Sequence, residues 1–180
     1  EISLPYPTTV PCENQRFTYF FYWDTYFTNL GLLYDMPKQA LNNLRNMKYL
    51  VERFGFIPNA NLTSMLNRSQ PPLFCCAVYD YYQLYPSLDI VYEFFGSMQR
   101  EYEFWSQSRI TECGLNGYSS SATEEEIERF IDEVALRGII DKNDCDAYEK
   151  AKNLFAEAES GWDFSPRFGG RALDFVQVDL

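Results

Sequence analysis

Residues 37–55 read PKQALNNLRNMKYLVERFG and carry the pattern of a single amphipathic helix. Leu44 and Val51 belong to a set of apolar residues that recur at helical spacing, so they share one face. Pro37 suits the first helical position because its fixed backbone angle matches the helix. Gly55 suits the position just after the last turn, where the chain turns left-handed. We therefore predict a helix that begins at Pro37 and ends before Gly55.

Similar apolar periodicity recurs on both sides of this helix. Helices are expected over residues 23–33, 73–85, 88–107 and 123–138, with a last helix from 141 or 144 to 158. Pro5, Pro7 and Pro11 keep the first twenty or so residues irregular, and no useful length of strand-like alternation occurs. The sequence therefore predicts an all-α chain of about six helices, with long loops that carry its unusual residues.

The composition limits the chemistry that this chain can perform. It has 180 residues, no histidine and a formal net charge of −11. Without imidazole, a Ser-His-Asp triad, a Cys-His pair and a His-ligated zinc site are all unavailable. Acid–base chemistry must then use carboxylates, tyrosine, lysine or cysteine. The acidic balance also argues against nucleic acid and anionic membranes as partners, because both attract clustered basic residues.

The cysteines indicate a reducing compartment. There are five, an odd number, and none forms a CxxC pair. Reduced thiols are typical of proteins inside the cell, so we expect a cytoplasmic location. Cys75 and Cys76 lie in an apolar run and are interpreted as small buried side chains.

Three segments carry polar and aromatic residues that a helical core does not need. They read RF…YWDTYF…GLL from residue 16, FIPN…NRSQPP from residue 56, and AESGWDFSPRF from residue 158. DFVQVDL follows at residues 174–180. In this order, and over residues from about 10 to 180, these segments resemble the signature motifs of trehalases. NRSQPP and ESGWDFSPRF are each several residues of specific identity, which makes the resemblance strong.

The resemblance implies an (α/α)6 toroid and an inverting glycoside hydrolase that cleaves α,α-trehalose to glucose, with no metal or organic cofactor. Asp163 corresponds to the general acid of the family. The sugar-contacting positions correspond to Arg16, Trp23, Asp24, Asn59, Arg68, Ser69, Gln70 and Gly161. We expect these polar residues to converge on one concave face, where a small carbohydrate binds.

The length of the chain implies that it is part of a larger catalytic domain. A toroid of six helical hairpins needs about twice as many helices as we predict, so residues 1–180 are expected to form a single partial domain. Its N-terminal and C-terminal parts would then be absent, and the remainder of the domain would be a partner. The family's general base lies downstream of the last motif. The isolated chain is therefore expected to be inactive, and Glu159 is the first candidate base if it is not.

Some positions depart from the usual pattern of the family. Residues 11–15 read PCENQ where the family has Pro-Gly-Gly before the arginine, and residues 60–65 read ANLTSM where it has Gly-Asn-Arg and two tyrosines. An Arg-Pro-Glu segment has no counterpart in residues 118–129. These changes bear on sugar specificity more than on the fold.

The residues also allow simpler interpretations. Asp163 can cap a helix or pair with Arg167, Arg68 can pair with Asp24, and Trp23 can be a core aromatic. For the whole protein, three alternatives stay open beside trehalose hydrolysis. They are an inverting hydrolase of another α-glucoside, a non-catalytic sugar-binding relative, and a helical module that binds another chain.

Overall fold

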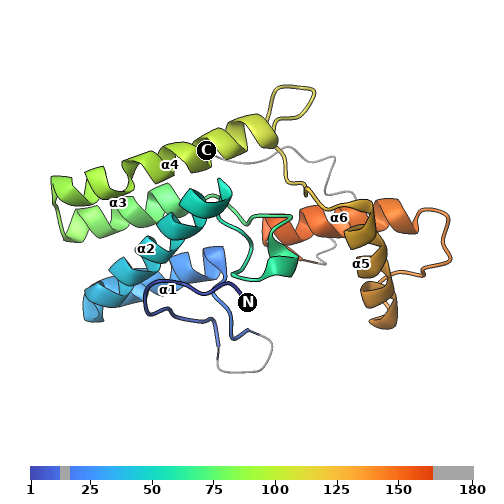
Figure 1. The fold of residues 1–180 in the computed structure, drawn as a ribbon, viewed down its shortest axis with the longest axis horizontal. Coiled ribbons are helices and arrows are strands. Elements are labelled where there is room, and N and C mark those ends of the chain that lie inside the picture. Colours follow the sequence, from blue (N-terminus) through green and yellow to red (C-terminus); the bar gives the residue numbers. More distant parts are fainter. Residues whose placement is uncertain (13–16, 164–180) are drawn as a thin grey trace.

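The computed structural model describes residues 1–12 and 17–163, and its regular elements are helices (Figure 1). Along the described residues these are α1 (Tyr22–Asp35), α2 (Pro37–Phe54), the 3-10 turn η1 (Thr63–Met65), α3 (Phe74–Leu84), α4 (Leu88–Ser108), α5 (Glu124–Leu136) and α6 (Ala147–Ser160). Extended pairing within the described ranges is limited to two isolated antiparallel bridges, Phe21 with Ala60 and Ile110 with Asn116. The prediction of an all-α chain of about six helices is confirmed.

The ends of α2 and α5 follow from local sequence. Gly55 has φ 83° and its N–H donates to the Val51 carbonyl at 2.8 Å, which closes α2. At the start of α5, the Thr123 hydroxyl accepts the N–H of Glu126 at 3.3 Å. The Glu126 carboxylate in turn accepts the N–H of Thr123 at 2.8 Å, which completes a capping box.

The last helix begins later than predicted. Asp141 accepts the N–H of Asn143 at 2.9 Å, and this local turn competes with helix formation. Lys150 reaches back to Asp144 at 2.6 Å, which holds the same acidic segment in front of the helix. The predicted start at residue 141 or 144 was therefore wrong, since α6 begins at Ala147.

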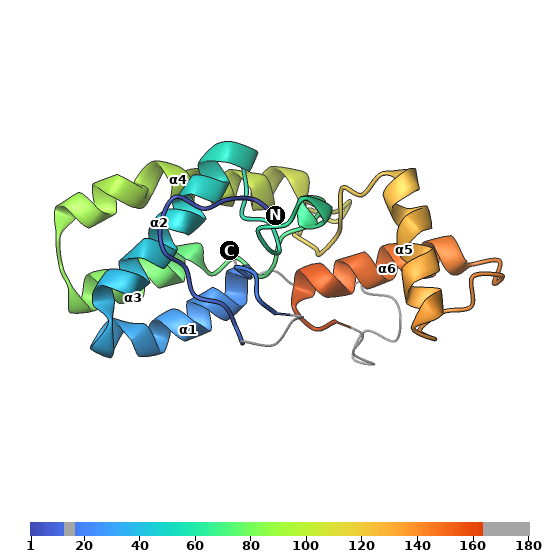
Figure 2. The same ribbon diagram turned by 60° about the horizontal axis from the view of Figure 1, so that its bottom comes forward.

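The helices form two groups (Figure 2). Helices α1 to α4 pack around one core, whose fully buried members include Tyr22, Leu44 and Phe94. Helices α5 and α6 pair beside this bundle, where Phe130 stacks on Phe155 with ring centroids 4.3 Å apart. The loop between α2 and α3 lies between the two groups, so it can contact both (Figure 1).

Part of the bundle surface is aromatic. Tyr92 and Phe95 on α4 are 75% and 59% exposed, and Tyr79 on α3 is 61% exposed. Cys75 and Cys76 on α3 are also exposed, so the interpretation of both as buried side chains was wrong. A run of apolar residues predicts that part of a helix is buried. It does not indicate which side chains of that helix the other helices cover. None of the described helices is long and apolar enough to cross a membrane.

Candidate active site

The first two motif segments lie side by side at the beginning of α1. The N–H of Tyr22 donates to the Asn59 carbonyl at 3.1 Å, and the N–H of Asn61 donates to the Phe20 carbonyl at 3.1 Å. The second segment also turns back on itself, since the N–H of Asn59 donates to the Arg68 carbonyl at 2.9 Å. Main-chain bonds therefore place both ends of this loop next to the first turn of α1.

Gln70 caps α1 from a distance. The first amides of a helix have no partner within it, and Phe21 at the N-cap provides no side-chain acceptor. The Gln70 Oε1 atom accepts the N–H of Trp23 at 2.9 Å, although the two residues are 47 positions apart. This bond fixes the orientation of Gln70 relative to Trp23 and Asp24.

Asn59 and Ser69 are buried and use their polar groups inside the protein. The Asn59 Nδ2 group donates to the carbonyls of Ser69 and Ala158, both at 3.1 Å. The Ser69 hydroxyl donates to the Ile57 carbonyl at 2.6 Å. Their side chains are 5% and 0% exposed. The observed geometry therefore gives both residues a role in holding the loop against α6.

Gly161 brings the third segment against Trp23. It ends α6 in the left-handed conformation with φ 74°. A Cβ atom built on Gly161 would lie 2.6 Å from Cζ2 of the Trp23 indole, well inside van der Waals contact. The indole therefore occupies the space that any side chain at position 161 would need. This contact joins α1 to the end of α6.

Asp163 lies within the electrostatic reach of Arg68 and Asp24. Its side chain is exposed to solvent, but the surrounding protein atoms desolvate it enough to raise the pKa of its carboxyl. The positive charge of Arg68 opposes this rise in pKa, and the negative charge of Asp24 adds to it. Partial burial also raises the pKa of Asp24. A carboxyl group that keeps its proton more readily suits a general acid.

Arg68 is a buried cation with unused hydrogen-bonding capacity. Its Nη1 group donates to Asn67 Oδ1 at 2.7 Å, and its Cζ atom lies 5.0 Å from the centre of the Phe155 ring. Its Nε group is buried and has no hydrogen-bond partner within the described part of the chain. Desolvation lowers the pKa of Arg68, and the charges of Asp163 and Glu159 oppose this. No ion pair between Arg68 and Asp24 is present among the described residues.

The predicted site residues fall into three groups. Those that meet where the three segments join are Trp23, Asp24, Arg68, Gln70, Gly161 and Asp163. Asn59 and Ser69 lie deeper, beneath the loop. Arg16 and Arg167 lie outside the described residues, so the predicted contact of Arg16 stays a prediction.

A buried ion pair beneath the site was not predicted from the sequence. Arg109, which follows α4, donates from Nε and Nη2 to the two oxygens of Glu159 at 2.8 and 2.9 Å. The same oxygens accept the N–H groups of Ser69 at 2.8 Å and Ser119 at 2.7 Å. Glu159 is fully buried. All four of its acceptor positions are used, so Glu159 is not a candidate general base.

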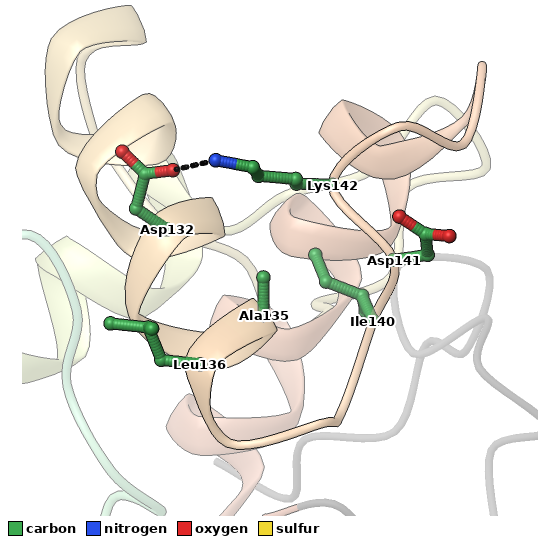
Figure 3. A pocket seen from close by; sticks show the side chains of 6 residues that line it. All are labelled: Asp132, Ala135, Leu136, Ile140, Asp141 and Lys142. Atoms are coloured by element: carbon green, nitrogen blue, oxygen red, sulfur yellow. Dashed lines mark ion pairs between the residues drawn. The ribbon is translucent and has the colours of Figure 1, made fainter.

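The open hollow drawn in Figure 3 lies elsewhere. Its volume is about 670 Å³, and its lining includes Leu136 of α5 and Ile140 of the loop before α6. Asp132 and Lys142 form an ion pair across it at 3.7 Å. None of the predicted site residues lines this hollow, so it does not bear on the proposed chemistry.

The described part of the site offers a partly desolvated carboxyl group within the electrostatic reach of an arginine. Residues 1–172 match the Trehalase family model. This chain therefore belongs to the trehalase family, whose members are glycoside hydrolases.

Individual relatives agree with this assignment. The chain is 35% identical to a trehalase from Dictyostelium discoideum, and the match covers 99% of this chain and 34% of that protein. It is 34% identical to a periplasmic trehalase from Pseudomonas aeruginosa, with 98% and 35% covered. The chain thus spans about a third of the length of these relatives.

The fold also matches a solved structure. The neutral trehalase from Saccharomyces cerevisiae superposes with a TM-score of 0.77 at 22% identity, over 97% of this chain and 37% of that chain. The two chains therefore share a fold, which agrees with the expectation of a portion of the trehalase toroid.

Proposed function

We propose that the protein containing this chain hydrolyses α,α-trehalose to glucose with inversion, and that Asp163 is its general acid. The observation that carries the proposal is the meeting of Asp163, Arg68 and Asp24 at the junction of three trehalase-like segments. Desolvation and the charge of Asp24 both raise the pKa of Asp163, as a group that must deliver a proton near neutral pH requires.

The proposed reaction assigns separate roles to the residues that meet. Asp163 protonates the glycosidic oxygen as the bond to the leaving glucose breaks. Arg68 donates hydrogen bonds to sugar hydroxyls from its guanidinium group. Trp23 offers an apolar ring face, and Gln70 and Asp24 line the same junction. A second carboxylate activates water on the opposite side, about 6.5–9.5 Å from the acid.

That second carboxylate belongs, in this proposal, to the part of the protein that lies outside residues 1–180. Glu159 is unsuitable because its oxygens are saturated by four donors. The remaining part of the toroid would also cover the exposed aromatic residues of α3 and α4, among them Tyr79 and Tyr92. In this proposal residues 1–180 form one partial catalytic domain that is inactive by itself.

The test is turnover of trehalose by the full-length protein, with the anomers of the product followed by NMR. Inversion yields one glucose in the β form at first. Asp163→Asn should lower kcat by roughly a hundred- to ten-thousandfold, because the amide cannot donate the proton that the leaving group needs. Asp132→Asn is the matched control, since Asp132 is an exposed carboxylate away from the site. Retention of configuration, or full activity in Asp163→Asn, contradicts the mechanism.

The alternative that the substrate is another α-glucoside is supported by one feature of the loop that carries Asn59 and Arg68. Residues 62–65, where the motif departs from the family pattern, include the exposed 3-10 turn η1. Changes on this turn can reshape one sugar subsite and leave Asp163 in place, as expected for a hydrolase of another α-glucoside. Assays with maltose, kojibiose and glucosylglycerate separate the two substrates.

The thiols support a cytoplasmic location for the protein. All five cysteines are free, and four of them are exposed. Exposed thiols persist in a reducing compartment and are oxidised outside it. Rapid alkylation during cell lysis should therefore label all five. Recovery of the protein with oxidised thiols, or from a periplasmic extract, contradicts this location.

A further inference from the structure

Glu159 occupies a position that is unfavourable for a carboxylate unless it has a specific role. It is fully buried and lies in the last turn of α6, where the helix dipole disfavours negative charge. A buried carboxylate requires partners, and its four are Arg109 Nε, Arg109 Nη2, Ser69 N–H and Ser119 N–H. They come from two loops that are distant in sequence, the one between α2 and α3 and the one between α4 and α5, so Glu159 joins both loops to α6.

We propose that Glu159 and Arg109 form a buried clasp that positions the active site, with Glu159 as the positioning residue. This inference rests on the proposed function, because the residues that it positions are the proposed acid and sugar contacts. Asp163 follows Glu159 after three residues, Ser160, the helix-ending Gly161 and Trp162. Ser69, which Glu159 binds directly, lies between Arg68 and Gln70.

The geometry gives the clasp two connected effects. On the loop side, the bond from Ser69 N–H fixes the backbone between Arg68 and Gln70, and Gln70 in turn holds the N–H of Trp23. On the helix side, the Trp23 indole lies against Gly161, two residues before Asp163. A shift of the Glu159 carboxylate would therefore move the sugar-binding loop and the acid relative to each other.

Arg109 has a charge role as well as a structural one. It is 6% exposed, lies 4.7 Å from the centre of the Phe104 ring, and pairs with both oxygens of Glu159. The bidentate pair gives the buried negative charge of Glu159 two charge-assisted hydrogen bonds.

The inference is tested with Glu159→Gln in the full-length protein. In Glu159→Gln one carboxylate oxygen becomes an NH2 group, which cannot accept the two N–H groups that point at that oxygen. The hydrogen bonds on that side of residue 159 are therefore lost, and the clasp opens there. We expect KM for trehalose to rise at least about threefold and kcat to fall roughly tenfold to a hundredfold, because small displacements of catalytic groups have effects of that size. A loss of folded protein would lower kcat and leave KM unchanged. A folded variant with wild-type KM would therefore overturn the inference.

The matched control is Glu93→Gln. Glu93 forms a bidentate pair with Arg45, at 2.7 and 3.1 Å, that connects α4 to α2 away from the site. This variant should lose thermal stability and keep the wild-type kcat and KM. An equal rise of KM in Glu93→Gln would show that Glu159 has no special role. If Glu159→Gln does not fold, Arg109→Lys decides, because one ammonium group cannot replace the two-pronged contact. A wild-type KM in Arg109→Lys would overturn the inference.

Hydrogen exchange separates this inference from the proposed function. In the wild type the amides of Ser69 and Ser119 should be protected, and both should exchange at least about tenfold faster in Glu159→Gln, while amides of α2 stay unchanged. If the wild type does not hydrolyse trehalose, the proposed function fails. The exchange rates of the Ser69 and Ser119 amides then test the Glu159–Arg109 pair by themselves. Unchanged exchange at Ser69 and Ser119 would overturn it.

Discussion

The pair of Tyr22 and Glu101 makes the stability of this protein depend on pH. Glu101 of α4 is 2% exposed, and its carboxyl accepts the hydroxyl of Tyr22 at 2.5 Å. The same hydroxyl accepts the N–H of Phe74, at the beginning of α3, at 2.8 Å. Desolvation raises the pKa of Glu101 to about 8, although the hydrogen bond from Tyr22 opposes the rise.

The sign and size of the effect follow from this pKa. In the unfolded chain Glu101 loses its proton near the ordinary pKa of 4.5, while the folded protein keeps it up to about pH 8. The folded state therefore binds more protons in this window. The resulting stabilisation is fully present below 4.5 and is lost as the pH rises through about 8. Proton linkage with these values amounts to roughly 3 kcal/mol between about pH 5 and pH 8.

Glu101→Gln removes the titration and keeps the shape of the side chain. The variant can still accept the hydroxyl of Tyr22, but it stays neutral at every pH. Urea unfolding of both proteins, measured from about pH 5 to pH 8, gives the difference in free energy of unfolding at each pH. We expect the wild type to lose roughly 3 kcal/mol relative to the variant over this range. A difference that stays constant with pH, or that changes in favour of the wild type, would refute the reasoning.

Three further predictions concern the site and its helices. In Asp24→Asn, the loss of a negative charge should lower the pKa of Asp163, so the basic limb of the pH–rate profile should move to lower pH. In Gly161→Ala, the new methyl group meets Trp23 and the left-handed backbone is strained, so thermal unfolding should show a loss of roughly 2–4 kcal/mol together with reduced kcat. In Thr123→Ala, removal of the capping hydroxyl should reduce stability by about 1 kcal/mol with kcat/KM unchanged.

The helices could be predicted because their signals are local. The apolar spacing in residues 37–55, the proline at one end and the glycine at the other act within a few turns, and α2 begins and ends where they indicate. The capping box at Thr123 is equally local. The start of α6 was missed because several aspartates compete for the helix start, and the choice between them depends on weak turn contacts.

The order of the three motif segments was enough to indicate the family and to make Asp163 and Arg68 candidate site residues. Only the tertiary structure decided which neighbouring polar residues are buried supports, as Asn59 and Ser69 are. It alone paired Arg109 with Glu159 across 50 residues and Tyr22 with Glu101 across 79. Such pairs leave no periodic trace in a sequence, because the partner of a buried charge is chosen by how helices pack and not by spacing along the chain.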